Sequence, residues 1–249
     1  MKTKLLRKAV VLLIALFLVF VGFKYISFYY MKKGISATDN AEKVKYFSKS
    51  AAMLNDQSRL LRAMTYIEMK RYDDALVDLL YTVKHHSEYP VTYLYLGNVY
   101  YELNKDEEAL KAYDSALKLM PDYIAKELGA KSATKTLAET YGMTSSQVAD
   151  NLTVKLYLDR AASLAKLKRF ADSFTDVEKA REVSPADPYV YLARSKIYEM
   201  MNDKKNSVKD YNTAFALRRQ AEEQMEKMQK QIAEKIKENM EKIPAAPAK

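Results

Sequence analysis

The chain has 249 residues, a formal net charge of +9 and no cysteine, which excludes disulfides, thiolate catalysis and cysteine-ligated metal sites. The surplus charge is local, because residues 1–37 hold seven Lys or Arg and no acid, whereas residues 38–217 are balanced. A nucleic-acid-binding protein carries positive charge on its folded body. We therefore expect no nucleic-acid partner.

The first 37 residues predict a membrane anchor followed by a short linker. Residues 1–8 contain four basic side chains, and residues 9–23 contain no charge. About 20 apolar residues span a bilayer, so residues 5–31 suffice if the Lys24 side chain reaches the interface. A cleaved signal peptide is the alternative. Because cytoplasmic flanks are rich in Lys and Arg, we expect the rest of the chain on the periplasmic side of a bacterial inner membrane.

Residues 90–123 carry the most regular pattern in the chain. Apolar and small residues follow helical spacing on either side of a polar turn at 103–106. These residues are Tyr93, Leu96, Gly97, Tyr100, Ala109, Tyr113 and Ala116. The pair Gly97 and Ala109 is expected to let two helices approach closely, and Pro121 is expected to end the second helix.

This 34-residue unit resembles a tetratricopeptide repeat (TPR). Weaker copies occupy 56–89, 154–187 and 188–221, although Arg59 and Arg62 stand where large apolar residues are usual. Residues 124–153 interrupt the repeat. The resemblance implies an all-α fold, a TPR-type solenoid of helical hairpins over 38–219.

A half repeat is expected before the first full copy. Asp39-Asn40-Ala41-Glu42 has the form of a capping box, which predicts the start of a helix. This helix resembles the second helix of a repeat whose first helix is lost to the linker.

The resemblance also implies a concave groove lined by the first helix of each repeat. The residues at the groove positions are Leu60, Met64, Ile67, Val91, Leu94, Asn98, Tyr101, Leu158, Tyr189, Leu192 and Lys196. Leu94, Asn98 and Tyr101 are expected to form a continuous strip that holds an extended peptide. The alternative is that several of these side chains pack between neighbouring helices.

Residues 220–249 are predicted to form an amphipathic helix followed by a Pro/Ala tail. Its apolar stripe consists of Met225, Met228, Ile232, Ile236, Met240 and Ile243. The stripe is expected to cap the open end of the solenoid. Self-association through 220–243 as a coiled coil and occupation of the groove are the alternatives.

No pattern in the sequence supports catalysis or a cofactor. The only histidines, His85 and His86, are adjacent on a predicted helix and point about 100° apart, so we expect no shared metal. We predict a non-enzymatic, membrane-anchored TPR adaptor that binds a protein or extended peptide. A chaperone-like role toward exported proteins is one version, and a self-associating structural subunit is the competing hypothesis.

Overall fold

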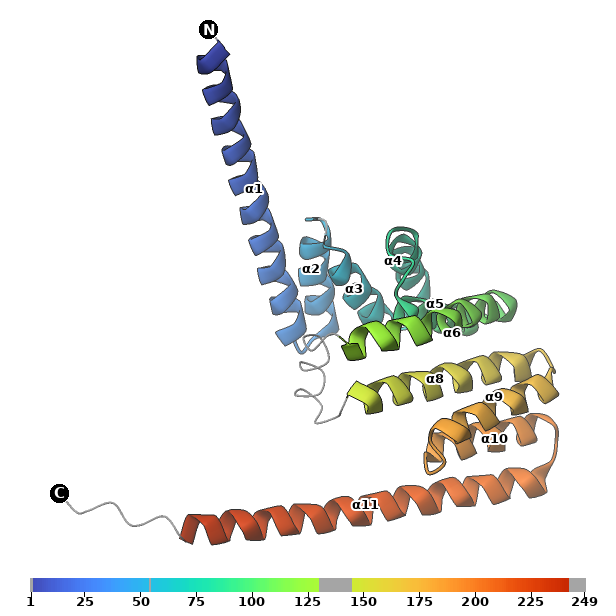
Figure 1. Ribbon diagram of the computed structural model, residues 1–249. Helices are drawn as coiled ribbons and strands as arrows, with labels where there is room; N and C mark the ends of the chain where they lie inside the picture. The colour runs from blue at the N-terminus through green and yellow to red at the C-terminus, as the bar shows by residue number, and fades with distance from the viewer. Residues whose placement is uncertain (1, 54, 130–144, 242–249) are drawn as a thin grey trace. The chain divides into compact units, whose positions relative to one another are not determined.

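The computed structural model describes residues 2–53, 55–129 and 145–241, and the regular elements in these ranges are all helices (Figure 1). The chain divides into two compact units, Met1–Ser146 and Gln147–Lys249. The first unit contains α1 (Lys2–Ser36), α2 (Asn40–Ala51), α3 (Asp56–Glu68), α4 (Tyr72–His85), α5 (Pro90–Glu102) and α6 (Asp106–Gly129). The second contains α8 (Ser145–Lys166), α9 (Phe170–Val183), α10 (Pro188–Met200) and α11 (Lys204–Glu241).

The four expected hairpins are confirmed, as α3–α4, α5–α6, α8–α9 and α10–α11. Each turn places one residue in the left-handed region, with φ between 56° and 61°. These residues are Lys70, Asn104, Lys168 and Asn202. The next backbone N–H then bonds back across the turn, as from Lys105 to the Tyr100 carbonyl at 2.8 Å. The same closure recurs at the same position of every repeat.

The expected linker after the apolar segment is wrong, because α1 continues as a helix to Ser36 and packs on α2. The hydroxyl of Ser50 donates to the Ser27 carbonyl at 2.8 Å, and both residues are buried. A Cβ placed on Gly34 would lie 2.4 Å from the Phe47 ring, so only glycine fits there. The end of α1 is therefore the first helix of the half repeat. The Asp39 cap is confirmed by a bond from the Glu42 N–H at 2.9 Å.

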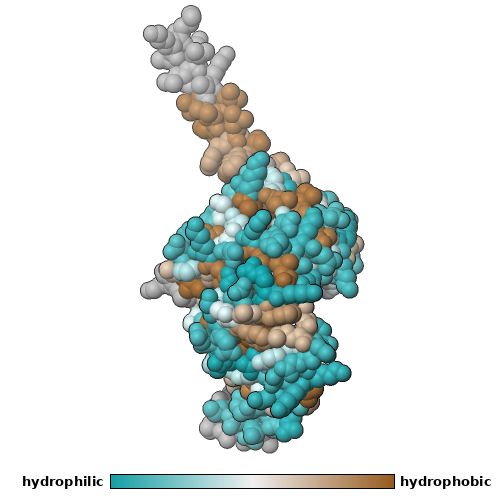
Figure 2. Space-filling model, turned by 90° about the vertical axis from the view of Figure 1, so that its right-hand side faces the viewer, coloured by the Kyte–Doolittle hydropathy of each residue, from teal (hydrophilic) through white to brown (hydrophobic). Residues whose placement is uncertain are grey.

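The N-terminal part of α1 extends beyond the repeats as an apolar helix. Its segment Leu12–Ser36 is long and apolar enough to cross a membrane, a property that signal sequences share. Large side chains from Leu12 to Val21 are exposed, so they do not belong to the core of the unit. In Figure 2 this part of α1 forms the brown projection at the top.

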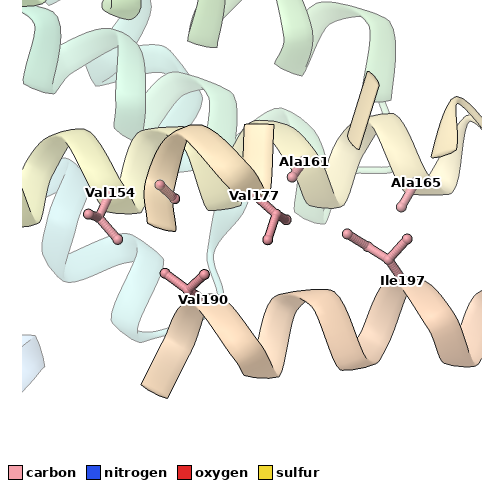
Figure 3. Packing of buried hydrophobic residues seen from close by; sticks show 7 residues of the cluster. Val154, Ala161, Ala165, Val177, Val190 and Ile197 are labelled. Carbon is pink, nitrogen blue, oxygen red and sulfur yellow. The ribbon is translucent and has the colours of Figure 1, made fainter. Parts of the chain in front are cut away.

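Each unit has its own core between paired helices. In the first unit, Ala63, Ala75, Leu79 and Val99 are almost completely buried. In the second, Val154, Ala161, Val177, Val190 and Ile197 point toward one another from α8, α9 and α10 (Figure 3).

Two details of the strongest repeat differ from expectation. A Cβ on Gly97 would lie 2.4 Å from Cε1 of Tyr113, so the glycine makes room for this ring rather than for Ala109. Pro121 lies inside α6, which continues to Gly129. Proline removes one N–H donor from a helix, and here the helix continues past it. Of the rest of the irregular segment 124–153, residues 145–153 belong to α8, and residues 130–144 lie outside the described residues.

The expectation that the C-terminal helix caps the solenoid is wrong for the described residues. α11 is one continuous helix of 38 residues, and every residue from Arg218 to Ile236 is exposed. No glycine or proline interrupts it, so it has no local signal to fold back onto the last repeat. Pairs such as Arg218–Glu222 and Glu226–Lys230 support the helix along its length. The side chain of Met240, and Ile243 altogether, lie outside the described set.

Candidate functional site

The predicted groove residues divide into three groups. Leu94 is 1% exposed, so its assignment to an open groove is wrong. Leu60, Ile67 and Leu158 are partly buried against the unit cores, as the packing alternative expects. Met64, Val91, Asn98 and Tyr101 are also half-buried, whereas Tyr189, Leu192 and Lys196 are exposed.

The strip expected on α5 is reduced by internal contacts. The Tyr113 hydroxyl donates to the amide oxygen of Asn98 at 2.8 Å, inside the same hairpin. With Leu94 buried, this bond leaves no continuous open strip from Leu94 to Tyr101. On α10, Lys196 pairs with Glu199 at 2.7 Å. Some of the predicted groove residues line two other surfaces instead.

One such surface is a cavity of about 580 Å³ in the first unit, here called the α1 pocket. It is lined by Lys24, Asn55, Asp56, Gln57, Leu60, Thr82, His86, Tyr89 and Thr92. The first turns of α3 and α5 both contribute to it, together with α1 and the end of α4. Leu60 is the predicted groove residue in this pocket, and its other lining residues are mostly polar.

The second surface is a cavity of about 430 Å³ between α10 and α11, here called the α10–α11 groove. It is lined by Pro188, Tyr189, Leu192, Tyr211, Ala214, Phe215, Arg218, Ala221, Glu222 and Met225. Tyr189 and Phe215 are 69% and 63% exposed. Such large apolar side chains on one open surface are typical of a binding site. The structure thus brings the predicted pair Tyr189 and Leu192 together with residues of α11 that the sequence reasoning missed.

Buried Arg–Asp pairs are a further feature that the sequence reasoning missed. Arg62 donates through Nε and Nη2 to the carboxylate of Asp78, at 2.7 and 2.6 Å. Arg160–Asp176 and Arg194–Asp210 repeat this bidentate geometry. In each pair the residues are 16 apart at the same repeat position, a spacing that is readable in the sequence.

These pairs join helices as well as neutralising charge. Nη1 of Arg62 reaches the Ser48 hydroxyl on α2 at 2.9 Å, and Nη1 of Arg194 reaches Glu178 on α9 at 3.0 Å. The bond to Asp78 raises the pKa of Arg62 above its ordinary value although burial acts in the opposite direction. Asp210 does the same for the pKa of Arg194. The arginines therefore remain charged in the packed repeats.

The two histidines serve separate local contacts. His85 Nδ1 lies 2.8 Å from the Tyr81 carbonyl in the last turn of α4. His86 Nε2 lies 2.7 Å from the Asp56 carboxylate in the α1 pocket. Among the described residues, no group of three or more His, Asp or Glu side chains is placed to hold a metal ion.

Comparison with known proteins gives the repeat its name. Residues 90–123 match the family model of the tetratricopeptide repeat. The chain contains a TPR. A DnaJ homolog subfamily C member 7 homolog of Dictyostelium discoideum is 25% identical over 190 residues, which cover 68% of this chain. The chain spans only 35% of the length of that relative.

Solved structures share the helical arrangement at low identity. MamA from Desulfovibrio magneticus has a TM-score of 0.60 at 10% identity, covering 80% of this chain and 96% of that one. A thermophilic TPR protein of Thermus thermophilus has a TM-score of 0.55 at 14% identity, covering 77% and 91%. The fold is a TPR-type solenoid. The TPR match and these likenesses together support the assignment of the chain as a TPR protein. The TPR fold is one of protein-interaction scaffolds.

Proposed function

We propose that this chain is a non-enzymatic, membrane-anchored scaffold that binds an extended segment of a partner protein. The observation that carries the proposal is the α10–α11 groove. Tyr189 and Leu192 occupy the repeat positions at which TPR proteins are expected to meet a partner, and both side chains are exposed beside Phe215. Burying one such side chain contributes about 1.5–3 kcal/mol, so a few of them suffice for specific binding.

The test is a crosslinking pull-down from intact membranes with the full chain. The double variant Tyr189→Ala with Leu192→Ala removes the groove surface without touching a buried residue. We expect recovery of the partner to fall about tenfold or more, with the melting curve unchanged. Val77→Ala on α4 is the matched control, because Val77 is exposed and lies in neither cavity. Equal recovery with the double variant and the control would reject the groove.

Anchoring is supported by the exposed apolar part of α1 and the four basic residues before it. The proposal places the N-terminus in the cytoplasm of a bacterial cell and the repeats outside the inner membrane. Protease added to intact spheroplasts should digest the repeats. Complete protection of the repeats in intact spheroplasts, with digestion after lysis, would reverse the orientation.

A chaperone-like version of this role, directed at exported chains, fits the match to a DnaJ homolog. An unfolded segment offers the extended backbone and apolar side chains that an open groove accepts. Full chain in detergent should then delay aggregation of a chemically unfolded test protein. The double variant should lose this effect, and an unchanged delay would reject this version.

Self-association is the second candidate function, and a specific observation favours it. Met225, Met228, Ile232 and Ile236 are all at least half exposed along one helix. If the tail drives self-association, truncation after Arg219 should reduce the mass of the particle in solution from that of an oligomer to that of a monomer. A fragment for this measurement should begin at Lys24, because the end of α1 covers Phe47 and Ser50 of α2. A monomer with the intact tail would reject this candidate.

A further inference from the structure

The α1 pocket contains a buried hydroxyl that lacks a partner. Thr92 is fully buried on the first turn of α5 and lines the pocket. Its Oγ1 has no hydrogen-bond partner among the residues that the structure describes. Buried polar groups are nearly always paired, with protein, water or a ligand. A molecule that enters the pocket deeply enough to reach Oγ1 would supply the missing partner.

The pocket is also suited to a negative charge. Lys24 lines it; its ammonium group lies 5.7 Å from the centroid of the Phe20 ring and makes no ion pair within the described part of the chain. Both α3 and α5 begin at the pocket; Asn55 caps α3 through the Ser58 N–H, and α5 starts with Pro90. The positive end of the α5 dipole still favours a negative charge there. Tyr89 precedes α5 and gives it no side-chain cap.

The acidic side chain in the pocket, Asp56, already has basic neighbours. Asp56 has one carboxylate oxygen 2.7 Å from His86 Nε2 and the other 3.6 Å from Nε of Arg59. These contacts leave Lys24 as the cation in the lining with no acidic partner among the described residues.

The height of Lys24 along α1 identifies the anion. The segment before it, residues 5–23, contains Arg7 and Lys8, and its charge-free part, residues 9–23, covers about 22 Å at 1.5 Å per residue. Because long Lys side chains reach from the ends of a span to the interfaces, this part, which lies between Lys8 and Lys24, can span the hydrocarbon thickness of a bilayer, about 30 Å. Lys24 and the pocket edge therefore lie at the level of the lipid headgroups when α1 spans the membrane. The exposed apolar surface of α1 continues from Lys24 into the hydrocarbon, where acyl chains would lie.

We propose that the α1 pocket binds the phosphate group of a membrane phospholipid, with Lys24 and the Thr92 hydroxyl as its ligands. The inference rests on the proposed anchoring through α1. It does not depend on which side of the membrane the repeats occupy, since Lys24 ends the span on the repeat side in either orientation.

The test uses delipidated full chain in detergent, titrated in native mass spectrometry with three probes. Dioctanoyl phosphatidylglycerol should bind, whereas dioctanoylglycerol, which lacks the phosphate, and inorganic phosphate should bind at least about tenfold more weakly. Tight binding of inorganic phosphate would overturn the lipid as the source of the anion. Equal binding of dioctanoylglycerol would overturn the phosphate as the group recognised.

Variants then separate a ligand role from a structural one. Thr92→Val keeps the shape of the side chain and should weaken phosphatidylglycerol binding about tenfold. It should not lower the melting temperature of lipid-free chain, because the hydroxyl gives up no internal bond. Lys24→Gln should weaken binding similarly. Lys32→Gln is the control, a cation on α1 outside the pocket. Unchanged binding by Thr92→Val, or equal weakening by Lys32→Gln, would overturn the proposal.

Failure of the anchoring is detected separately. Wild-type chain in native membranes should resist alkaline carbonate extraction. Extraction of the chain would reject the anchoring and, with it, the headgroup assignment. Resistance to extraction, combined with no retained phosphatidylglycerol, would reject the pocket proposal alone.

Discussion

The repeat at 90–123 and the repeat at 56–89 fill the same pair of packing positions with opposite kinds of residue, apolar in one and charged in the other. In the first, Leu96 faces Ala112, and both are buried and apolar. In the second, the corresponding residues are Arg62 and Asp78, joined by two short hydrogen bonds. The repeats that begin at 154 and 188 follow the charged solution.

The difference shows that departure from a repeat consensus is not the same as weak packing. Replacing a buried ion pair with apolar residues is often neutral or stabilising, whereas breaking it by removing one partner is costly. What the pairs of Arg62 and Arg194 add is a third bond to the preceding hairpin, from Arg62 to Ser48 and from Arg194 to Glu178. The repeats that begin at 56 and 188 are thereby held in register with the hairpin before them.

The largest effect is expected from breaking one charged pair. Asp78→Ala leaves the half-buried Arg62 with the Ser48 hydroxyl as its hydrogen-bond partner and should cost about 3–5 kcal/mol of unfolding free energy. The double variant Arg62→Leu with Asp78→Ala copies the apolar solution and should recover most of this loss. Urea unfolding followed by circular dichroism measures both. A double variant as unstable as the single one would show that the two solutions are not interchangeable.

The next effect concerns the glycine of the apolar repeat. Gly97→Ala drives a methyl group into the Tyr113 ring and should cost about 1–3 kcal/mol. Gly22→Ala is the matched control, because nothing lies within 4 Å of its Cβ position. In the 56–89 repeat, Ala63 already occupies the equivalent position opposite Leu79. Tyr113→Leu should therefore rescue Gly97→Ala in thermal melts, and lack of rescue would mean that the ring is not the obstacle.

A smaller gain is expected at the turns. Lys168 holds φ at 59°, a conformation that costs non-glycine residues about 1–2 kcal/mol. Lys168→Gly should stabilise the chain by about 0.5–1 kcal/mol, after the greater freedom of glycine in the unfolded state is subtracted. Asn104→Gly should gain less, because asparagine visits this region readily. Equal gains in the two melting curves would contradict this ranking.

The smallest effect is a pH dependence at the start of α11. The Asn206 backbone N–H, and then its side-chain amide, bond to Asp203 and hold the pKa of this carboxyl below its ordinary value of 3.8. A depressed folded-state pKa gives a contribution that is present above pH 3.8 and is lost as the pH falls through the folded pKa. Asp203→Ala should thus lower the melting temperature at pH 7, with the difference shrinking below about pH 4. If the difference in melting temperature between wild type and Asp203→Ala does not change with pH, the charge of Asp203 is not its cause.

The hairpins were predictable because their signals are local and periodic. The spacing of Tyr93 and Gly97 marks the inner face of one helix, and Tyr113 lies on the inner face of the next. This pattern lies within one repeat, so no distant contact is needed to predict the hairpin. The half repeat was only partly predictable. Gly34 and Phe47 are 13 residues apart, whereas Gly97 and Tyr113 are 16 apart, so a search at the repeat period misses the shorter hairpin.

The candidate site was less predictable because exposure depends on packing between repeats. Leu94 has the position of a groove residue, yet it is buried. Phe215 lies on the second helix of its repeat, where no groove residue was expected, and is open because α11 runs on past α10. The orphaned hydroxyl of Thr92 has no sequence signature, since threonine is common at the start of helices.

Because α1 is one continuous helix up to its contact with α2, it limits where the proposed scaffold can meet a partner. From Lys24 to Ser36 the helix rises about 18 Å and has no joint at which the body could swing. With α1 in the membrane as proposed, the first unit, which α1 joins without a break, stays close to the bilayer, so it samples partners by lateral diffusion in two dimensions. A segment that emerges near the membrane surface is within its range, whereas one held far above it is not.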